Sequence, residues 1–380
     1  MNTPLQISKF RAGRQVRQTG YRSFIPEKVN RQWIVDSPQT ETLIAEAHRK
    51  LGELNAFSQL IPDIDFFIYM HKAKEATTSS RIEGTQTRIE EAFLRIEEVN
   101  PELRDDWQEV QNYIEAMNYA IGELENLPLS NRLLRHTHRL LMQGVRGRHK
   151  QPGEFRQSQN WIGGASLQDA VFIPPPQQDV PDLMGDLEQF LHNEDIHVPE
   201  LVRIAIAHYQ FETIHPFLDG NGRIGRLLIT LYLVSRRLLV RPSLYLSAFF
   251  EKNRMLYYDN LNRTREQHAL DHWLKFFMVG VIETSESSIQ TFRNILQLKA
   301  QIEVQLATLG KKQSNALQLL QFLFSKPVVN AKDVAEAIQG SAPTANSLLA
   351  DFVQLQILQE TTGYQRNRVF HFKPYLDLFG

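Results

Sequence analysis

The chain has 380 residues, with 42 Lys and Arg against 43 Asp and Glu and a formal net charge of −1. This length has room for one large and one small domain, and the balanced charge excludes a global field that would attract nucleic acid or an anionic membrane. The sequence has no cysteine, which excludes disulfides, thiolate metal sites and thiol nucleophiles.

The N-terminal residues MNTPLQISKFRAGRQVRQTG lack the apolar segment of a secretory signal. The longest apolar run, from Leu227 to Val234 and interrupted by Thr230, is far shorter than the roughly 20 residues that span a bilayer. We therefore expect a cytoplasmic protein that makes no membrane contact.

In chain order, residues 1–36 are expected to form a polar N-terminal arm rather than a core element. From Ser37 to about residue 290, apolar residues recur at spacings of three and four, which predicts a mainly α domain over residues 37–290. Inside this domain, Gly163-Gly164 and Pro174-Pro175-Pro176 bracket a short apolar run, a pattern that favours a strand or hairpin.

A long helix is predicted from about Glu283 to Leu309, ended by Gly310, so that residues 291–310 form a linker helix. Beyond it, three shorter helices are predicted, followed by two β-like runs around Gly363. The helices are expected at Ala316–Phe324, Ala331–Ile338 and Pro343–Leu355. This order is that of a winged-helix domain, which we expect over residues 311–380.

Residues 215–226, HPFLDGNGRIGR, contain the pattern G-x-G-x-x-G at Gly220, Gly222 and Gly225. A dinucleotide-binding fingerprint requires a strand before the first glycine and an acidic residue about 20 positions later. Here the preceding segment has helical apolar spacing and then a proline, and no carboxylate follows until Glu251. The Rossmann interpretation therefore fails.

The same stretch has the residue types of a different phosphate site. A helix that starts near Gly220–Gly222 presents unpaired N–H groups and the positive end of its dipole to an anion. Arg223 and Arg226, one turn apart, can add contacts to phosphate, and Asp219 can hold Mg²⁺ against a polyphosphate. His215 is placed to act as a general base. Each residue alone is usually structural, but their conjunction within twelve residues favours function.

The string matches the Fic-family motif H-x-F-x-[DE]-G-N-G-R-x-x-R at every defined position, and the chain resembles that family from about residue 40 to 285. The resemblance implies a helical core that transfers AMP from ATP to a Ser, Thr or Tyr hydroxyl of a protein, releasing pyrophosphate. His215 would deprotonate the hydroxyl, Asp219 would hold Mg²⁺, and Arg226 would meet the γ-phosphate. The implied nucleotide-binding residues are Gly220, Asn221, Gly222, Arg223, Ile224, Gly225 and Arg226, with Gly225 a coincidence of spacing rather than a fingerprint residue.

Residues 79–84, SSRIEG, place Ser79 and Glu83 at i and i+4, on one face of a helix. Taken alone, this is an ordinary helix face. It also resembles the family's inhibitory pattern [ST]-x-x-x-E-[GN], which implies that Glu83 pairs with Arg226 and withdraws it from ATP. Breaking a buried ion pair from one side costs about 3–5 kcal/mol, so we expect an autoinhibited enzyme. Some inhibited relatives also remove AMP, and the sequence leaves that reaction open.

Ala170 to Pro176, AVFIPPP, is apolar and β-prone. One interpretation is an edge strand protected by prolines. The resemblance implies instead a flap that docks the target protein by strand addition, with residues Asp169, Ala170, Val171 and Phe172 over the nucleotide. Tyr257 and Tyr258 are either core residues or neighbours of the adenine.

Other features carry less weight. His136 and His138 do not share a helix face and make a zinc protease a poor hypothesis, and Arg156 is interpreted as structural. The predicted recognition helix, Thr344–Leu355, has no Arg or Lys, whereas the hairpin tip Tyr364–Arg368 does, so DNA and protein are equally good partners for this domain. The rival function is a nucleotide-sensing, winged-helix DNA-binding regulator without transferase activity. A homodimer is expected by analogy alone.

Overall fold

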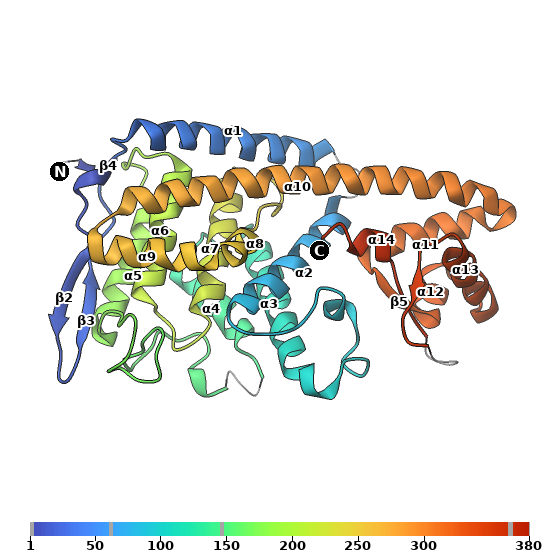
Figure 1. The fold of residues 1–380 in the computed structure, drawn as a ribbon, viewed down its shortest axis with the longest axis horizontal. Helices are drawn as coiled ribbons and strands as arrows, with labels where there is room; N and C mark the ends of the chain where they lie inside the picture. Colours follow the sequence, from blue (N-terminus) through green and yellow to red (C-terminus); the bar gives the residue numbers. More distant parts are fainter. Residues whose placement is uncertain (1–3, 61–63, 145–147, 364–367, 380) are drawn as a thin grey trace.

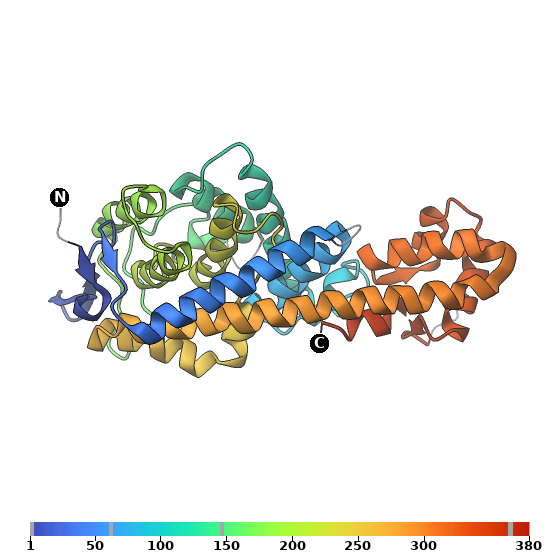
Figure 2. The same ribbon diagram turned by 90° about the horizontal axis from the view of Figure 1, so that it is seen from above.

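The computed structural model describes residues 4–60, 64–144, 148–363 and 368–379. Two long helices, α1 (Pro38–Leu60) and α10 (Leu270–Leu306), lie side by side along the length of the molecule (Figures 1 and 2). The buried face of α1 includes Ile44, Ala47, Leu51 and Leu54, at the three- and four-residue spacing of an amphipathic helix. With 37 residues, α10 spans about 55 Å.

The predicted start of the long helix at Glu283 is wrong, because α10 begins at Leu270. The polar run ETSESS at residues 283–288 resembles a helix start, but here it lies inside a continuous helix. Residues 291–306 are therefore the extension of a helix rooted in the larger domain. The predicted end of the helix lies nearer to the observed one: α10 ends at Leu306, and Gly310, with a φ of 56°, marks a kink just after it.

A helical bundle fills the space below this pair of helices (Figure 1). Every residue of α6 after Glu200 is buried, which makes it the central helix of the bundle. The helices of the bundle are α2 (Ile64–Ile82), α3 (Arg104–Glu123), α4 (Asn131–Leu141), α5 (Val180–His192), α6 (Glu200–Ile214), α7 (Asn221–Ser235), α8 (Ser247–Lys252) and α9 (Arg254–Gln267). Short 3₁₀ helices occur at Ile7–Lys9, Glu91–Phe93, Pro101–Leu103, Arg148–Lys150, Gln177–Asp179 and Ala307–Lys312.

The N-terminal segment is not the polar arm predicted over residues 1–36. Its strands β1 (Leu5–Gln6) and β4 (Trp33–Ile34) pair in parallel, and β2 (Gly13–Arg17) and β3 (Arg22–Pro26) form an antiparallel hairpin. Between the exposed Arg and Gln side chains, the segment buries Ile7, Phe10, Ala12, Phe24, Val29 and Trp33 in the core. The average polarity of the segment concealed these apolar positions.

The C-terminal region contains the three predicted helices, now α11 (Gln313–Ser325), α12 (Ala331–Ala337) and α13 (Ala342–Gln354). A three-stranded antiparallel sheet accompanies them, in the order β5 (Val328–Asn330), β7 (Val369–His371), β6 (Gln359–Glu360), and α14 (Lys373–Leu376) follows. Asn330 and Asp333 form a capping box at the start of α12. The predicted hairpin tip at residues 364–367 lies outside the described residues.

The C-terminal region packs on α2 and α10. The ring of Phe67 on α2 lies 5.7 Å from that of Phe324 on α11, and the ring of His71 lies 5.3 Å from that of Phe379. Helix α2 is thus packed between the larger domain and the C-terminal region. Along the described part of the chain, no helix is both long enough and apolar enough to cross a membrane.

Candidate active site

The twelve-residue motif forms the connection between α6 and α7. His215 ends α6 in a left-handed conformation (φ 51°, ψ 61°), and Gly220 caps the start of α7 with a φ of 74°. A left-handed backbone is strained at a histidine but not at a glycine, and such strain is concentrated at functional sites. Helix α7 begins at Asn221, as the sequence predicted, so its first-turn N–H groups face the end of this loop.

Side chains outside the motif brace this loop. Arg156 donates from Nε to the carbonyl of His215 (2.9 Å) and from a terminal nitrogen to the carbonyl of Pro175 (2.5 Å). Asn221 accepts from the N–H of Phe217 and donates to its carbonyl, both at 2.8 Å. Arg156 is therefore structural, as predicted, whereas the Asn221 side chain shapes the loop and leaves only its backbone for a ligand.

His138, which the sequence offered only as a poor metal ligand, also belongs to this support. Its Nε2 donates to the carbonyl of Asp219 (3.0 Å), its Nδ1 accepts from the N–H of Gly153 (2.9 Å), and its ring stacks on Phe217. His136 stacks on Tyr119 instead, so the two histidines do not converge. No sequence signal distinguished His138 from an ordinary helix residue.

The His215 imidazole is held neutral. Burial, reinforced by the positive charges of Arg265 and Arg156, lowers its pKa to about 3. Its Nδ1 is buried, and a hydrogen bond to the backbone of Glu212 offsets part of this lowering. A neutral imidazole can accept a proton on its unprotonated nitrogen.

The structure brings Ser79, Glu83 and Arg226 together. The Arg226 side chain is 1 % exposed. Its Nε donates to the Ser79 hydroxyl (2.8 Å), and one terminal nitrogen donates to the Ser79 carbonyl (2.9 Å) and to Glu83 Oε1 (2.7 Å). Burial raises the pKa of Glu83, but the charge and hydrogen bond of Arg226 outweigh it and the pKa is lowered, so the pair is ionic. Glu83 lies one residue beyond the end of α2, just before Gly84.

The Glu83 carboxylate lies against the first turn of α7. A Cβ atom on Gly222 would be 2.3 Å from Glu83 Oε1 and 2.8 Å from Arg226 Nη1, so only glycine leaves room for this contact. A helix N-terminus stabilises a negative charge. Glu83 therefore places its own carboxylate where the sequence predicted that a phosphate would bind.

Arg223 and Asp219 lie on the other side of this helix start. Arg223 donates to Glu109 of α3 (3.1 Å), and its second terminal nitrogen is 3.8 Å from Asp219 Oδ1. Both residues line a cavity of about 460 Å³, which Glu83 also lines. In the described parts of the chain, no group of three or more His, Asp or Glu side chains has the arrangement of a metal site. The site fits a Mg²⁺ ion held by one carboxylate and otherwise by phosphate oxygens, as is usual for magnesium.

Two residues expected to bind nucleotide face the core instead. Ile224 is fully buried, and a Cβ atom on Gly225 would lie 2.3 Å from Glu212 Oε1 and 3.1 Å from Phe211 on α6. The carbonyl of Gly225 accepts a hydrogen bond from His208 Nδ1 (2.8 Å). Gly225 is therefore no coincidence of spacing, because it allows α6 and α7 to pack closely.

Tyr257 is also a core residue. It is 1 % exposed, its ring stacks on Phe250 at 4.4 Å, and its hydroxyl donates to His208 Nε2 (2.9 Å). The half-buried Tyr258, with its ring 5.1 Å from that of Tyr257, is the only residue of the pair that a nucleotide can reach in this conformation.

The predicted flap is a single antiparallel bridge between Ile162 and Phe172. Phe172 is buried beneath the Arg265 guanidinium, 3.9 Å from its ring centroid, and anchors the flap. Asp169 accepts from the N–H groups of Ala165 and Ser166 (2.8 and 2.7 Å), so its carboxylate closes the flap turn rather than facing a ligand. Bonds from Ser166 and Ala165 lower its pKa to about 2.

Much of the predicted docking edge at residues 170–176 is already used within the chain. The carbonyl of Ile173 accepts from the N–H of Phe24 on β3 (2.9 Å), and those of Pro174 and Pro175 accept from Gln159 (3.0 Å) and Arg156. The Val171 side chain is 66 % exposed, while its N–H donates to the carbonyl of Ile162 (3.0 Å). The open part of the flap is therefore its start, at the half-buried Ala170 and the side chain of Val171.

Two buried carboxyl groups near Arg226 were missed by the sequence analysis. Burial raises the pKa of Glu75 to about 7, and Oε1 of this residue accepts from the hydroxyls of Ser247 (2.5 Å) and Tyr113 (3.3 Å). Burial likewise raises the pKa of Glu212 to about 7. Neither residue lies in a recognisable motif, and only the fold surrounds them with apolar atoms.

Comparisons with family models and with individual proteins both relate the chain to Fic proteins. The family models described as "Fic/DOC family N-terminal" and "Fic/DOC family" match residues 41–122 and 128–233, respectively. "Protein adenylyltransferase Fic" of Drosophila erecta is 34% identical over 135 residues, which are 34% of this chain and 25% of that protein. "Probable protein adenylyltransferase aq_aa38" of Aquifex aeolicus is 30% identical over 186 residues, 44% of this chain and 55% of that protein. The matches thus span between a quarter and about half of these relatives.

Among solved structures, the crystal structure of a Fic family protein from Desulfovibrio desulfuricans G20 covers 89% of this chain and 97% of its own. Its TM-score is 0.55 at 22% sequence identity. This similarity establishes a common fold, which agrees with the mainly helical fold predicted from the sequence.

We expect Gly225→Ala to lower the free energy of unfolding by about 1–3 kcal/mol, because its Cβ would collide with Glu212 and Phe211. Gly185→Ala in α5 is the matched control, since a Cβ there meets nothing within 4 Å. That variant should be more stable by up to about 1 kcal/mol, from helix propensity alone. Urea unfolding of both variants checks this, and equal effects would contradict the packing role of Gly225.

We also expect stability to fall as the pH decreases from 6 to 5. Burial lowers the pKa values of His71 and His138 to about 4 and those of His208 and His215 to about 3, so all four imidazoles gain a proton on unfolding below pH 6.5. The carboxyl groups with raised pKa, Glu75 and Glu212, lose protons on unfolding in the same window and offset part of this. On balance, unfolding takes up about two protons, the four gained by the imidazoles less the two lost by the carboxyl groups. The free energy of unfolding therefore falls by about 3 kcal/mol for each unit by which the pH decreases.

Urea titrations at pH 5, 5.5 and 6 measure this slope. His71→Gln should reduce this slope by the contribution of about one proton. His149→Gln, at an exposed position, should leave the slope unchanged. A slope that both variants alter equally would show that the buried imidazoles are not its source.

Proposed function

The chain belongs to the Fic/DOC family, and we propose that it is a protein adenylyltransferase, held inactive by its own Glu83, that transfers AMP from ATP to a Ser, Thr or Tyr hydroxyl of a target protein. The observation that carries the proposal is the contact of Glu83 with Arg226 and Gly222 at the start of α7. His215 stands at the other end of the same loop, so a base and an anion site flank one turn.

In the active state, the neutral His215 imidazole takes the proton of the target hydroxyl while its oxygen attacks the α-phosphorus of ATP. The bond from the α-phosphorus to the bridging oxygen breaks, and pyrophosphate leaves. The first-turn N–H groups of α7 bind the phosphates, and Arg226 meets the γ-phosphate once Glu83 has left. Asp219 is the residue to hold Mg²⁺, which would neutralise phosphate charge.

Inhibition follows from the competition of two anions for one guanidinium. Arg226 is buried and cannot remain unpaired, because an isolated buried charge costs several kcal/mol. The Glu83 carboxylate satisfies it and also repels a phosphate from the α7 N-terminus. ATP must therefore displace Glu83 before its γ-phosphate can bind productively.

We expect Glu83→Gly to raise self-labelling with labelled ATP and Mg²⁺ by at least tenfold, because it frees Arg226 and the helix start. Glu83→Gln is the matched variant: it keeps the side-chain shape and loses the charge, so its labelling should fall between those of wild type and Glu83→Gly. In the Glu83→Gly background, His215→Ala should reduce transfer by about 10²–10⁴-fold.

Equal labelling of wild type and Glu83→Gly would refute autoinhibition through this contact. Full labelling by the His215→Ala variant would refute the assigned base. The two results are independent, since the first concerns access of ATP and the second concerns the chemical step.

We propose that the target docks at the open part of the flap. The Val171 side chain is exposed beside the bridge between Ile162 and Phe172. Because the Val171 N–H already donates to Ile162, an extended peptide would bind here through this side chain and the remaining backbone groups of the flap. Because Ile173 is already bonded to β3, the N-terminal hairpin closes the far end of this edge. An incoming strand is thereby restricted to the end of the flap that carries Ala170 and Val171.

In the Glu83→Gly background, Val171→Asp should lower labelling of proteins in a cell lysate several-fold and leave the affinity for ATP unchanged. Val353→Asp on α13 is a matched control, because that valine is also exposed and lies outside the flap. Comparable losses in both variants would argue against docking at the flap.

A further inference from the structure

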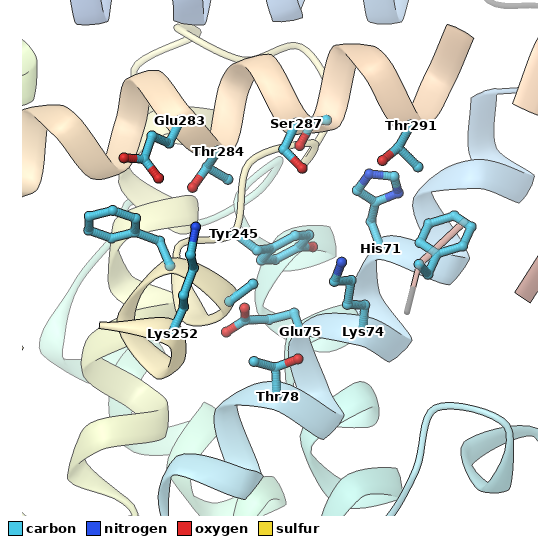
Figure 3. A pocket seen from close by; sticks show the side chains of 14 residues that line it. His71, Lys74, Glu75, Thr78, Tyr245, Lys252, Glu283, Thr284, Ser287 and Thr291 are labelled. Carbon is cyan, nitrogen blue, oxygen red and sulfur yellow. The ribbon is translucent and has the colours of Figure 1, made fainter. Parts of the chain in front are cut away.

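A cavity of about 180 Å³, lined by both apolar and polar side chains, lies between α2, α8 and α10, outside the site described above. It is comparable in size to an engineered cavity of about 150 Å³ that accepts benzene. Figure 3 shows side chains from these three helices pointing into it, with α10 above and α2 below. Phe379 of the C-terminal region also lines it.

Two buried polar atoms of residues that line this cavity lack hydrogen-bond partners. They are Oε2 of Glu75 and the hydroxyl of Tyr245, on residues that are 3 % and 8 % exposed. Neither atom has a hydrogen-bond partner among the residues that the structure describes. Glu75 lies between Tyr245 and Thr78 in Figure 3. A buried polar atom without a partner costs about 1–3 kcal/mol, so these two atoms favour a ligand that can hydrogen-bond to them.

Two ammonium groups flank Glu75 in the same view, those of Lys74 and Lys252. Burial lowers the pKa of Lys74, and the charge of Glu251 offsets part of this effect. The carboxyl groups that line the cavity are Glu283 on α10 and Glu75, whose pKa of about 7 leaves it partly protonated at neutral pH, while His71 is neutral. The two ammonium groups, neither of them held in a salt bridge within 4 Å among the described residues, can bind an anion between them.

Helix α10 contributes a row of hydroxyl groups to the roof of the cavity. Thr284, Ser287, Ser288 and Thr291 recur at helical spacing, so they share the face of α10 that is turned toward α2. Hydroxyl groups both donate and accept, and several of them together suit a ligand that carries hydroxyls of its own.

We propose that this cavity binds a small hydroxylated anion, carrying a phosphate or carboxylate, and that the bound ligand holds α2 in its inhibitory position. Lys74 and Lys252 contact the charged group, and the α10 hydroxyls together with Glu75 and Tyr245 contact the hydroxyl end. The binding site stands on the cavity alone, whereas the regulatory effect rests on the proposed adenylyltransferase activity.

The regulatory effect follows from the position of the cavity on α2. Glu75, Ser79 and Glu83 are spaced four residues apart along one face of this segment, and the last two hold Arg226. A ligand that touches α2, α8 and α10 together has its highest affinity when α2 is docked as observed. It therefore shifts the equilibrium toward the state in which Glu83 covers Arg226.

Calorimetric titration of the full-length wild type tests the site with glycerol 3-phosphate and malate as anions and glycerol as the neutral probe. We expect at least one anion to bind and glycerol not to bind, and the better anion identifies the charged group. Lys74→Gln combined with Lys252→Gln should weaken binding at least tenfold, whereas Lys311→Gln, at an exposed position, should not. Absence of binding by both anions, or binding that the double variant leaves intact, overturns the site.

Self-labelling with ATP tests the regulatory effect separately. The bound anion should lower labelling of the wild type several-fold and leave the Glu83→Gly variant unaffected, because that variant has lost the contact that the ligand reinforces. Equal inhibition of both proteins would place the anion at the phosphate site and overturn the regulatory effect. A Glu83→Gly variant without any transfer activity would refute the proposed enzyme, while the calorimetric result would still decide the binding site.

Discussion

The buried guanidinium of Arg226 is the group on which the rest of the site depends. It lies at the start of α7, 1 % exposed, with Glu83 as its hydrogen-bonded carboxylate partner. A buried cation of this kind must have an anionic partner, since desolvation without pairing costs several kcal/mol. The chain supplies that partner from Glu83, and a polyphosphate of matching charge is the natural competitor. In the mechanism that we propose, inhibition and substrate binding therefore use the same contact.

The surrounding structure keeps this contact at a helix N-terminus. Gly222 leaves space for the Glu83 carboxylate, and Gly225 lets α7 approach α6 closely. Arg156 donates hydrogen bonds to backbone carbonyls of the connecting loop, including that of His215, which ends α6 in a strained left-handed conformation. One helix–loop–helix unit and the end of α2 therefore place His215, the start of α7 and Glu83, the residues to which we assign the base, the anion site and the inhibition.

Segments far from the motif connect to this unit. The hairpin of β2 and β3 bonds to the flap through Phe24 and Ile173, so the N-terminal region bounds the edge at which we propose that the target docks. At the opposite side, the C-terminal region packs on α2 through Phe324 and Phe379. Because α2 also carries Ser79, any change in this packing reaches Arg226 through a single helix. The cavity between α2, α8 and α10 lies on that path.

The residue types and spacing of HPFLDGNGRIGR were enough to predict the anion site at the start of α7, because the N–H groups of a helix start are a local property. The pairing of Glu83 with Arg226 was expected only from the resemblance of SSRIEG to the family's inhibitory pattern, since its four-residue spacing alone is that of an ordinary helix face. The mainly α fold followed in the same way from the periodicity of apolar residues.

The tertiary structure alone decided which of these residues remain accessible. Ile224, Gly225 and Tyr257 face the core because α6 and α8 pack against them, and no local pattern encodes that choice. The same holds for the N-terminal segment, whose apolar side chains are hidden among arginines, and for Glu75 and Glu212, whose raised pKa values come from burial by distant helices. Local spacing specifies which groups can act together, whereas long-range packing decides which of them meet solvent, a ligand or one another.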